Sequence, residues 1–388
     1  MILPENEAHI RLDKVQREFR NGCDAILVTD NANLYYLTGR VFSGWAYLPA
    51  AGEAVFFVQR PVELAGANVV GVRKPEQMAE WLRSRDMIPG RLGLELDLLP
   101  YNMAERLRKA FEPLETVDCT PALRQARSRK TEMEIAMIRQ SGVKQTEVYS
   151  RIPSLFTIGM TDYELDVAIE HLSRQEGCLG QFRISGSSME FFMGNILAGE
   201  NADYPCPYDF ALGGKGMDPS LPVGASGDEI KRGMTVMVDE NGNYTGYMTD
   251  MTRVFSVGEV PAEAQRAHQL SIDIHDMFRR EARPGVEAKV LYEKAVQMVA
   301  DADMAGFFMG HRQHAGFIGH GVGIEINELP VIAPKSHAVL AEGNVIALEP
   351  KFVIPHVGAV GIENTYVIRR DSVECLTNAP ENIIPLED

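Results

Sequence analysis

The sequence predicts a two-domain protein, with an α/β domain first and an α+β domain after it. The chain has 388 residues, which exceeds the ~100 to 200 residues of an ordinary domain. Its first third alternates short β-rich runs with helical runs, whereas the remainder carries helical stripes followed by β-rich segments with tight turns. In the second domain we expect helices packed on a curved antiparallel sheet.

The expected N-terminal domain comprises residues 1–125. Strands and helices that alternate in this way are typical of a sheet covered by helices. The expected strands are 25–29, 54–58 and 92–96, and the expected helices are 74–84 and 102–111. Polar and basic residues interrupt the pattern over 119–129, so we place the end of the domain there.

The expected second domain, residues 126–388, begins with two helices that share a start signal. Thr131 and Thr161 each stand three residues before a glutamate. In such a capping box the threonine hydroxyl accepts a hydrogen bond from a first-turn amide while the glutamate reaches back. Apolar residues at helical spacing predict a further pair of helices over 262–280 and 287–300.

Two β-rich runs joined by turn-prone residues carry Asp239 and Asp250. The interval between them is odd, so a two-residue loop at 244–245 would make them direct cross-strand partners. A turn at 241–242, Asn-Gly, is the stronger hairpin signal and would keep them on one face about four residues out of step. Two such carboxylates repel one another unless a cation lies between them.

Three further side chains are of metal-binding types. His320 lies among glycines, which let the backbone approach closely whatever the imidazole binds. Glu349 and Glu363 end or lie in apolar β-like runs, where a carboxylate needs a partner. Each residue alone also fits a turn, a cap, a core imidazole or a surface charge. Together, four carboxylates and one imidazole suit Mn, Fe, Co or Zn, and two ions rather than one, because four anions over-neutralise a single divalent ion.

With these residues the chain resembles the pita-bread-fold metallopeptidases, which include aminopeptidase P, prolidase and methionine aminopeptidase, and the non-peptidase creatinase. The resemblance lies in VDENGNYTGYMTDMTR, GHGVGIEINELP, LEPKF and GIENT, in the family's order, and covers roughly residues 130–388. Upstream, AILVTDNANLYYLTGR is similar to the N-terminal domain that accompanies prolidase, aminopeptidase P and creatinase.

The resemblance implies a role for each of the five side chains. Asp239 would chelate one ion, while Asp250 and Glu363 would bridge two. His320 and Glu349 would hold the second ion. A hydroxide shared by the ions would be the nucleophile, because metal coordination lowers the pKa of water, and Glu349 would exchange its proton. The resemblance also implies a homodimer.

Three positions around the expected site depart from the family pattern. Asn327 stands where the peptidases carry a second histidine that contacts substrate, and no histidine lies shortly before Asp239. Gly361 replaces an arginine found in many members. An amide hydrogen-bonds a carbonyl or an oxyanion but carries no proton near neutral pH. We therefore place Asn327, with Glu349 and His320, among the predicted catalytic residues.

Other polar residues near these motifs have two interpretations each. Lys351 stands where the family usually has glycine, and would either restore a cation near the site or be a solvated side chain. His311 and His314 would either reach the site as donors or form an exposed or structural pair. Residues 213–216, Gly-Gly-Lys-Gly, lack the full spacing of a phosphate loop, so we expect a loop that borders the cleft.

Composition excludes several classes of protein. The net charge of -16 and the pI near 5.1 argue against a nucleic acid partner, which needs clustered cations. No apolar run approaches the ~20 residues of a membrane span, and the N-terminal segment lacks the order of a signal peptide. We expect a cytoplasmic protein without a membrane partner. The five scattered cysteines contain no CxxC pair and are expected to be reduced thiols.

The sequence thus predicts a dinuclear-metal-dependent exopeptidase for short peptides, of the Xaa-Pro dipeptidase or aminopeptidase type. Its expected cofactors are two divalent ions of Mn, Co, Fe or Zn. The first alternative is a metal-dependent hydrolase of a small non-peptide C–N compound, as creatinase is within this fold, and Asn327 and Gly361 favour it. The second alternative is a catalytically silent binding protein on the same scaffold.

Overall fold

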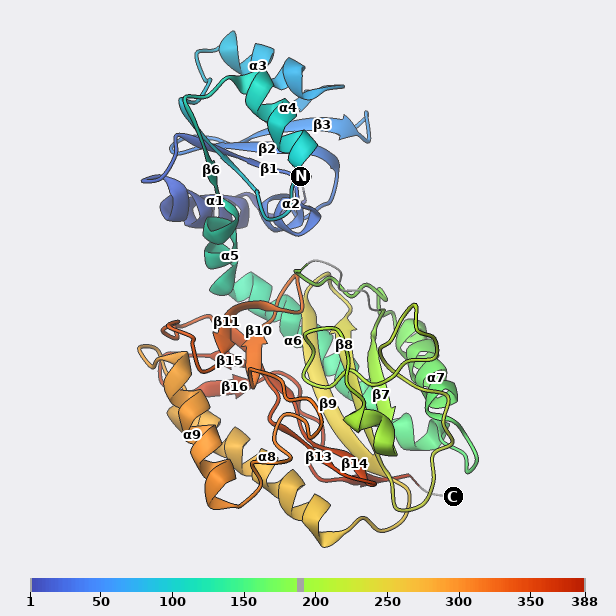
Figure 1. Ribbon diagram of the computed structural model, residues 1–388. Coiled ribbons are helices and arrows are strands. Elements are labelled where there is room, and N and C mark those ends of the chain that lie inside the picture. The colour runs from blue at the N-terminus through green and yellow to red at the C-terminus, as the bar shows by residue number, and fades with distance from the viewer. Residues whose placement is uncertain (1, 187–191, 387–388) are drawn as a thin grey trace. The chain divides into compact units, whose positions relative to one another are not determined.

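A computed structural model describes residues 2–186 and 192–386 of the chain, and Figure 1 shows its ribbon. The chain divides into two compact units, Met1–Arg127 and Ser128–Asp388. The division falls near the end of helix α5 (Thr120–Ser128), whereas the sequence placed it after residue 125, inside that helix. Among the described residues, no helix is long and apolar enough to cross a bilayer.

A mixed sheet forms the centre of the N-terminal unit. Its strands are β1 Ala25–Val28, β2 Ser43–Pro49, β3 Val55–Arg60, β4 Val69–Gly71, β5 Arg91–Leu94 and β6 Glu115–Asp118. They lie in the order β4-β3-β2-β1-β5-β6, with antiparallel pairing from β1 through β3 and parallel pairing elsewhere. Strands β1, β3 and β5 confirm the three β-rich runs expected from the sequence.

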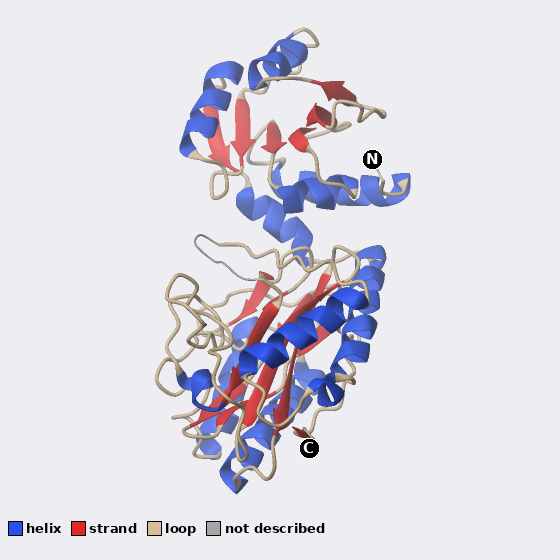
Figure 2. Cartoon of the chain, turned by 90° about the vertical axis from the view of Figure 1, so that its right-hand side faces the viewer, coloured by secondary structure: helices blue, strands red, loops and turns tan. Residues whose placement is uncertain are grey.

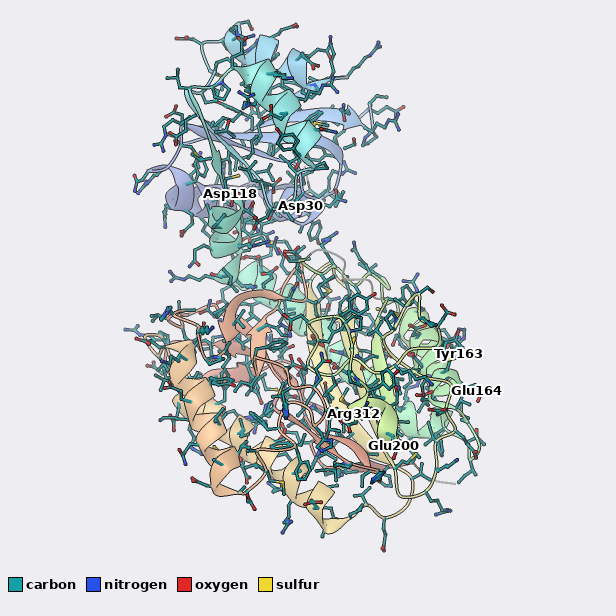
Figure 3. All side chains as sticks on the ribbon, in the orientation of Figure 1. Asp30, Asp118, Tyr163, Glu164, Glu200 and Arg312 are labelled. Carbon is teal, nitrogen blue, oxygen red and sulfur yellow. The ribbon has the colours of Figure 1, made fainter. Side chains whose placement is uncertain are left out.

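Helices cover this sheet. They are α1 Glu5–Phe19, α2 Asn31–Thr38, α3 Pro75–Arg83, α4 Tyr101–Phe111 and α5. Helices α3 and α4 confirm the two expected helices and pack their apolar faces on the sheet. Asp30, labelled in Figure 3, caps α2 by accepting from two first-turn amides. Helix α1 was not predicted because its buried face carries the Glu7–Arg11 ion pair, which weakens the apolar period.

The C-terminal unit contains several short sheets, mostly antiparallel. Its strands are β7 Gly194–Ala198, β8 Thr235–Asn243, β9 Met248–Ser256, β10 Gly319–Gly321, β11 Glu328–Ile332, β12 Val345–Leu348, β13 Lys351–Ile354, β14 Gly358–Gly361, β15 Asn364–Ile368, β16 Val373–Cys375 and β17 Ile384–Pro385. One sheet has the order β17-β9-β8-β7, and another the order β11-β10-β12-β15-β16. Strands β13 and β14 form a separate hairpin.

Long α-helices pack against these strands, as Figure 2 shows. They are α6 Glu132–Tyr149, α7 Asp162–Gln175, α8 Ala262–Glu281 and α9 Ala288–Asp301, and two short 3-10 helices span Ile152–Leu155 and Gly199–Asp203. Helices α6 and α7 share a core with β7, β8 and β9, while α8 and α9 share one with strands β11 to β15. These layers confirm the predicted helices over an antiparallel framework.

Both predicted capping boxes are present in the C-terminal unit. Thr131 Oγ1 accepts from the amide of Glu134, whose carboxylate accepts from the Thr131 amide in return. Thr161 and Glu164 make the same reciprocal pair at the start of α7, where Figure 3 labels Glu164. Local sequence therefore determines where α6 and α7 begin.

Candidate metal centre

Five strands or strand ends of the C-terminal unit bring the predicted metal ligands to one cavity. The structure places Asp239 on β8, Asp250 on β9, His320 on β10, Glu349 directly after β12 and Glu363 between β14 and β15. All five side chains line the same cavity. Side chains that are far apart in the sequence therefore lie close together in the structure, as we expected from carboxylates in apolar runs, which need a partner.

The register of the β8–β9 hairpin differs from both predicted turns. Asp239 faces Thr252, and Asp250 faces Asn241, so the two aspartates share a face without being direct partners. The connecting loop comprises residues 244–247. The prediction that both aspartates lie on one face of the hairpin was correct, because the odd interval between them gives this result with either predicted turn. The prediction that they pair directly across the strands was wrong.

The predicted Asn-Gly turn is wrong because residues 241–242 belong to β8. A side chain at Gly242 would come within 2.5 Å of Oγ1 of Thr249 and 2.8 Å of Oε1 of Gln145. Glycine at this position therefore permits close packing of helix α6 on the hairpin. The loop glycine is Gly246, whose φ of 87° lies in the left-handed region that favours glycine.

The glycines on either side of His320 allow the neighbouring strands to approach β10 closely. A side chain at Gly319 would come within 2.5 Å of the Ala347 carbonyl oxygen, and one at Gly321 within 2.2 Å of the Leu329 carbonyl oxygen. Close packing between β10 and the strands on either side therefore requires both glycines. The sequence correctly indicated a close backbone approach, but the approaching group is protein backbone.

The imidazole of His320 is oriented toward the carboxylates. Its Nδ1 lies 3.1 Å from the Gly321 carbonyl oxygen, and its Nε2 lies 3.3 Å from Oε1 of Glu349 and 3.9 Å from Oδ2 of Asp250. A backbone bond at Nδ1 fixes the tautomer that leaves Nε2 for a cation. Burial lowers the pKa of His320, but hydrogen bonding and the charge of Glu349 raise it further, to about 9.

The buried carboxylates repel one another. Burial and the Glu363 charge raise the pKa of Asp250 well above its ordinary value. Burial and the Glu349 charge raise the pKa of Glu363 to about 8. Oε1 of Glu363 is buried and has no hydrogen-bond partner among the described residues. An oxygen in this state is suited to a metal ligand, because a bound cation would satisfy it and relieve the repulsion.

Hydrogen bonds from several elements fix the segment that carries Glu363. Arg253 Nη1 donates to the Glu363 carbonyl oxygen at 2.8 Å, and Thr252 Oγ1 donates to Glu363 Oε2 at 2.8 Å. On the preceding residues, the Gly361 amide donates to Nδ1 of His268, and the Ile362 amide donates to a serine of α8. The sequence did not single out these supporting side chains, because nothing local distinguishes them from core residues.

Two groups of side chains within the described residues have the geometry to hold a metal ion. One is Asp250, His320 and Glu363, and the other is Asp239, Glu349 and Glu363. In each group the donor atoms lie within 4.8 Å of one another, and Glu363 belongs to both. A shared carboxylate is what two neighbouring cations require.

The Lys351 ammonium lies between the carboxylates of the second group. Its Nζ is 2.7 Å from Asp239 Oδ2, 2.7 Å from Glu349 Oε2 and 3.4 Å from Glu363 Oε2. The lysine side chain is 0% exposed, so it is the nearby cation that the sequence left open and not a solvated side chain. Burial raises the pKa of Glu349, but the Lys351 charge and His320 lower it to about 2.

Apolar side chains form much of the cavity wall around the carboxylates. They are Phe182, Ile184, Phe210, Phe317 and Ile326. Asn195, Asp209 and Asn327 add polar groups, and Asp209 is exposed. Most of these residues were not predicted because they come from loops, which have no hydrophobic period to indicate where a side chain points.

Asn327 lines the cavity while its amide binds the backbone of Ser185. The Ser185 amide donates to Asn327 Oδ1 at 2.7 Å, and Asn327 Nδ2 donates to the Ser185 carbonyl oxygen at 2.6 Å. The Ile326 amide also donates to the Arg183 carbonyl oxygen. This pairing holds the segment that carries Phe182 against β11. Direct action of Asn327 on substrate stays a prediction.

His311 and His314 lie beside the metal-centre cavity but do not line it. His311 Nδ1 is 3.0 Å from Asp203 Oδ2, and His314 Nδ1 is 2.9 Å from a backbone carbonyl oxygen. Both line an adjoining cavity that shares residues 209–212 with the first. Residues 213–216 follow that shared segment and lead into a loop, not a helix, so they lack the context of a phosphate loop.

Comparison with known proteins assigns both units. Residues 136–370 match metallopeptidase family M24, and residues 11–129 match the creatinase/prolidase N-terminal domain. An Xaa-Pro dipeptidase of Pyrococcus horikoshii is 27% identical over 370 residues, which cover 94% of this chain and 95% of that relative.

Solved structures share the fold along nearly the whole chain. The prolidase of Pyrococcus horikoshii has a TM-score of 0.78 at 24% identity, covering 95% of this chain and 98% of that one. An Xaa-Pro dipeptidase of Bacillus anthracis has a TM-score of 0.81 at 22% identity, covering 98% and 100%. These likenesses confirm the predicted α/β domain followed by a pita-bread domain. Since the family match spans more than half of its residues, the chain belongs to metallopeptidase family M24.

Proposed function

We propose that this protein is a metal-dependent exopeptidase that cleaves short peptides, with Xaa-Pro dipeptides as its first candidate substrates. One observation carries the proposal: Asp250, His320 and Glu363 converge in a cavity around a buried carboxylate oxygen that has no hydrogen-bond partner among the residues that the structure describes. Relatives named Xaa-Pro dipeptidase support the substrate class.

The side chains at the centre suit a divalent ion of Mn, Co, Fe or Zn. Carboxylate oxygens and one imidazole nitrogen are ligands that these ions accept. Such an ion would lower the pKa of water and polarise the carbonyl of a substrate. The number of ions depends on Lys351, whose ammonium lies within the second group of carboxylates.

Glu349 and His320 are suited to handle protons beside the reacting group. The Glu349 carboxylate lines the same cavity as the other proposed site residues, so it can accept a proton there as a nucleophile forms. His320 Nε2 lies 3.3 Å away and can share that proton. We therefore propose Glu349 as the residue that transfers the proton to the leaving amine, with His320 beside it.

The cavity wall fits a small substrate with one apolar and one cationic part. Phe182, Phe210 and Phe317 offer apolar surface for a proline ring. The exposed Asp209 carboxylate at the same cavity would pair with the free α-ammonium of a peptide. A rim ion pair contributes about 0.2 to 1 kcal/mol, so Asp209→Asn would raise KM by about 1.4- to 5-fold.

Peptide hydrolysis by purified protein tests the proposal. Protein supplied with Mn²⁺ or Co²⁺ should cleave Xaa-Pro dipeptides faster than the same dipeptides with alanine in place of proline. Asp250→Ala should abolish turnover, while Glu263→Gln, which alters an exposed carboxylate of α8, should leave it unchanged. Absence of turnover across a peptide panel would contradict the peptidase assignment.

A second candidate function is hydrolysis of a small non-peptide C–N compound. The specific observation in its favour is Asn327, whose amide bonds the Ser185 backbone through Oδ1 and Nδ2 and, unlike an imidazole, carries no proton near neutral pH that it could give to a peptide. A screen of amidino, lactam and amide compounds distinguishes this function from peptide hydrolysis. If the second function is right, metal-loaded protein will hydrolyse one of these compounds and will not cleave peptides.

We also propose that the protein is a cytoplasmic homodimer. The family resemblance supports the dimer. Light scattering after size-exclusion chromatography tests the dimer, which should elute at twice the chain mass of 43.0 kDa.

A further inference from the structure

We propose that the Lys351 ammonium permanently takes the place of one metal ion, so that the centre holds a single divalent ion between Asp250, His320 and Glu363. This inference rests on the proposed metal-dependent function and deepens it. It follows from where the lysine lies, how it is held, and how the charges of the site balance.

The ammonium occupies the position that a second ion would need. Nζ is 2.7 Å from oxygens of both Asp239 and Glu349 and 3.4 Å from one of Glu363. An ammonium has three N–H donors, and here three carboxylates surround it. A metal ion bound by these groups needs oxygens at about 2.0 to 2.2 Å, and such an ion would coincide with the nitrogen.

Burial and the backbone contacts of its hairpin hold the lysine in the site. Its side chain is 0% exposed, and its carbonyl oxygen accepts from the Met309 amide at 2.8 Å. Lys351 also pairs with Gly361 across the β13–β14 hairpin. A side chain at position 361 would come within 2.6 Å of the Pro350 carbonyl oxygen. Position 361 is therefore suited to glycine, which supplies no cation to the site.

The charges of the site favour one ion together with the lysine. One ammonium and one divalent ion offset three of the four carboxylate charges. A second divalent ion would place three cations around one shared carboxylate, where partial burial strengthens their repulsion. Removing the lysine without replacing it would leave Asp239 and Glu349 as uncompensated buried charges.

The other group of ligands is left for the ion. Glu363 Oε1 has no hydrogen-bond partner among the described residues, and Nε2 of His320 faces Asp250 at 3.9 Å. Two carboxylates and one imidazole nitrogen provide three protein ligands, the usual number at a catalytic divalent ion, with a further position left for water or substrate. The second group of carboxylates therefore binds the Lys351 ammonium, and the first group is left to bind the metal ion.

Metal stoichiometry tests the inference without reference to activity. Protein stripped with a chelator is titrated with Mn²⁺ by calorimetry, and bound metal is counted by elemental analysis. Wild type should bind one ion per chain. Lys351→Ala, which removes the ammonium and opens its space, should bind two. Lys351→Met, which keeps the bulk of the stem without its charge, should bind one, as should Lys335→Ala, in which an exposed lysine is replaced.

Several results would overturn the inference. The first is two bound ions in wild type. The second is no bound ion in wild type and none in Lys351→Ala. The third is one bound ion in wild type and also one in Lys351→Ala. If Lys351→Ala fails to fold, electron paramagnetic resonance of wild type with Mn²⁺ decides, because an isolated ion and a spin-coupled pair differ. One bound ion without turnover of peptides would refute only the proposed function, whereas two ions with turnover would refute only this inference.

Discussion

Lys351 and Asp239 form a buried ion pair, with Nζ 2.7 Å from Oδ2, that joins the β13–β14 hairpin to strand β8. Burial lowers the pKa of Lys351, but Asp239, Glu349 and Glu363 raise it well above its ordinary value. The lysine therefore remains charged where the chain gathers its carboxylates. A fixed cation in this position changes what the metal centre can bind.

Lys351→Ala is predicted to destabilise the metal-free protein. Breaking a buried ion pair by removing one partner costs about 3 to 5 kcal/mol, because the other charges remain buried. Thermal unfolding in a chelator should show a lower Tm than wild type, and added Mn²⁺ should raise the Tm of the variant more. Lys335→Ala is the matched control. Equal Tm values for Lys351→Ala and wild type in chelator would show that the pair does not hold the site together.

Glu349→Gln is predicted to lower kcat while bound metal stays the same. The amide cannot accept a proton, and general acid–base catalysis by one side chain contributes about 10²- to 10⁴-fold. Glu349 lies outside the group that we propose as the metal site, so elemental analysis should find as much bound metal as in wild type. Loss of the metal together with activity would instead identify Glu349 as a ligand.

Asn327→Ala is predicted to loosen the cavity wall. The substitution removes two hydrogen bonds to the backbone of Ser185, each contributing about 0.5 to 1.5 kcal/mol. Hydrogen exchange should become faster around residues 183–185, and KM should rise more than kcat falls. Asn382→Ala, which alters an exposed asparagine, is the control. A fall in kcat with unchanged exchange would indicate direct action of Asn327 on the substrate.

Stability is predicted to fall as pH rises because of a second group of buried carboxyls, between β8 and α7. Burial and the charges of Asp166 and Glu170 raise the pKa of Glu240 well above its ordinary value. Burial and Glu170 raise the pKa of Asp166 to about 8. Unfolded carboxyls titrate near about 4, so the folded protein holds protons that the unfolded chain releases between those values. The free energy of unfolding should therefore decrease across this window.

Glu240→Gln tests this pH dependence. Glu240 is 2% exposed and its Oε1 has no partner among the described residues, so removing its charge should stabilise the protein at pH about 8 by about 1 to 3 kcal/mol. The gain should be smaller at pH about 5, where the wild-type carboxyl is protonated. Urea unfolding at both pH values measures it, with Glu263→Gln as control. An equal effect at both values would contradict a titrating cause.

Local patterns predicted those parts of the fold that local interactions determine. The capping boxes at Thr131 and Thr161 and the apolar stripes of α8 and α9 predicted helices that the structure contains. These features depend on residues within a few positions of one another. Helix α1 was missed because Arg11, on its buried face, is satisfied by Glu7 and by a distant carbonyl oxygen.

Features set by contacts between distant segments were not predictable. Gly242 lies in β8 and packs closely against Gln145 of α6, whereas the Asn-Gly pair by itself indicates a turn. Lys351 and Asp239 are 112 residues apart, and nothing near either residue shows that they meet. The sequence supplied the chemical types of the ligands, and the tertiary structure determined which cation they surround.

Anomalous diffraction from crystals grown with Mn²⁺ would count the bound ions and locate them in one experiment. We expect one anomalous peak per chain, between Asp250, His320 and Glu363, with the Lys351 ammonium in electron density between Asp239 and Glu349. Two peaks that share Glu363, with the lysine turned away from the carboxylates, would contradict this expectation.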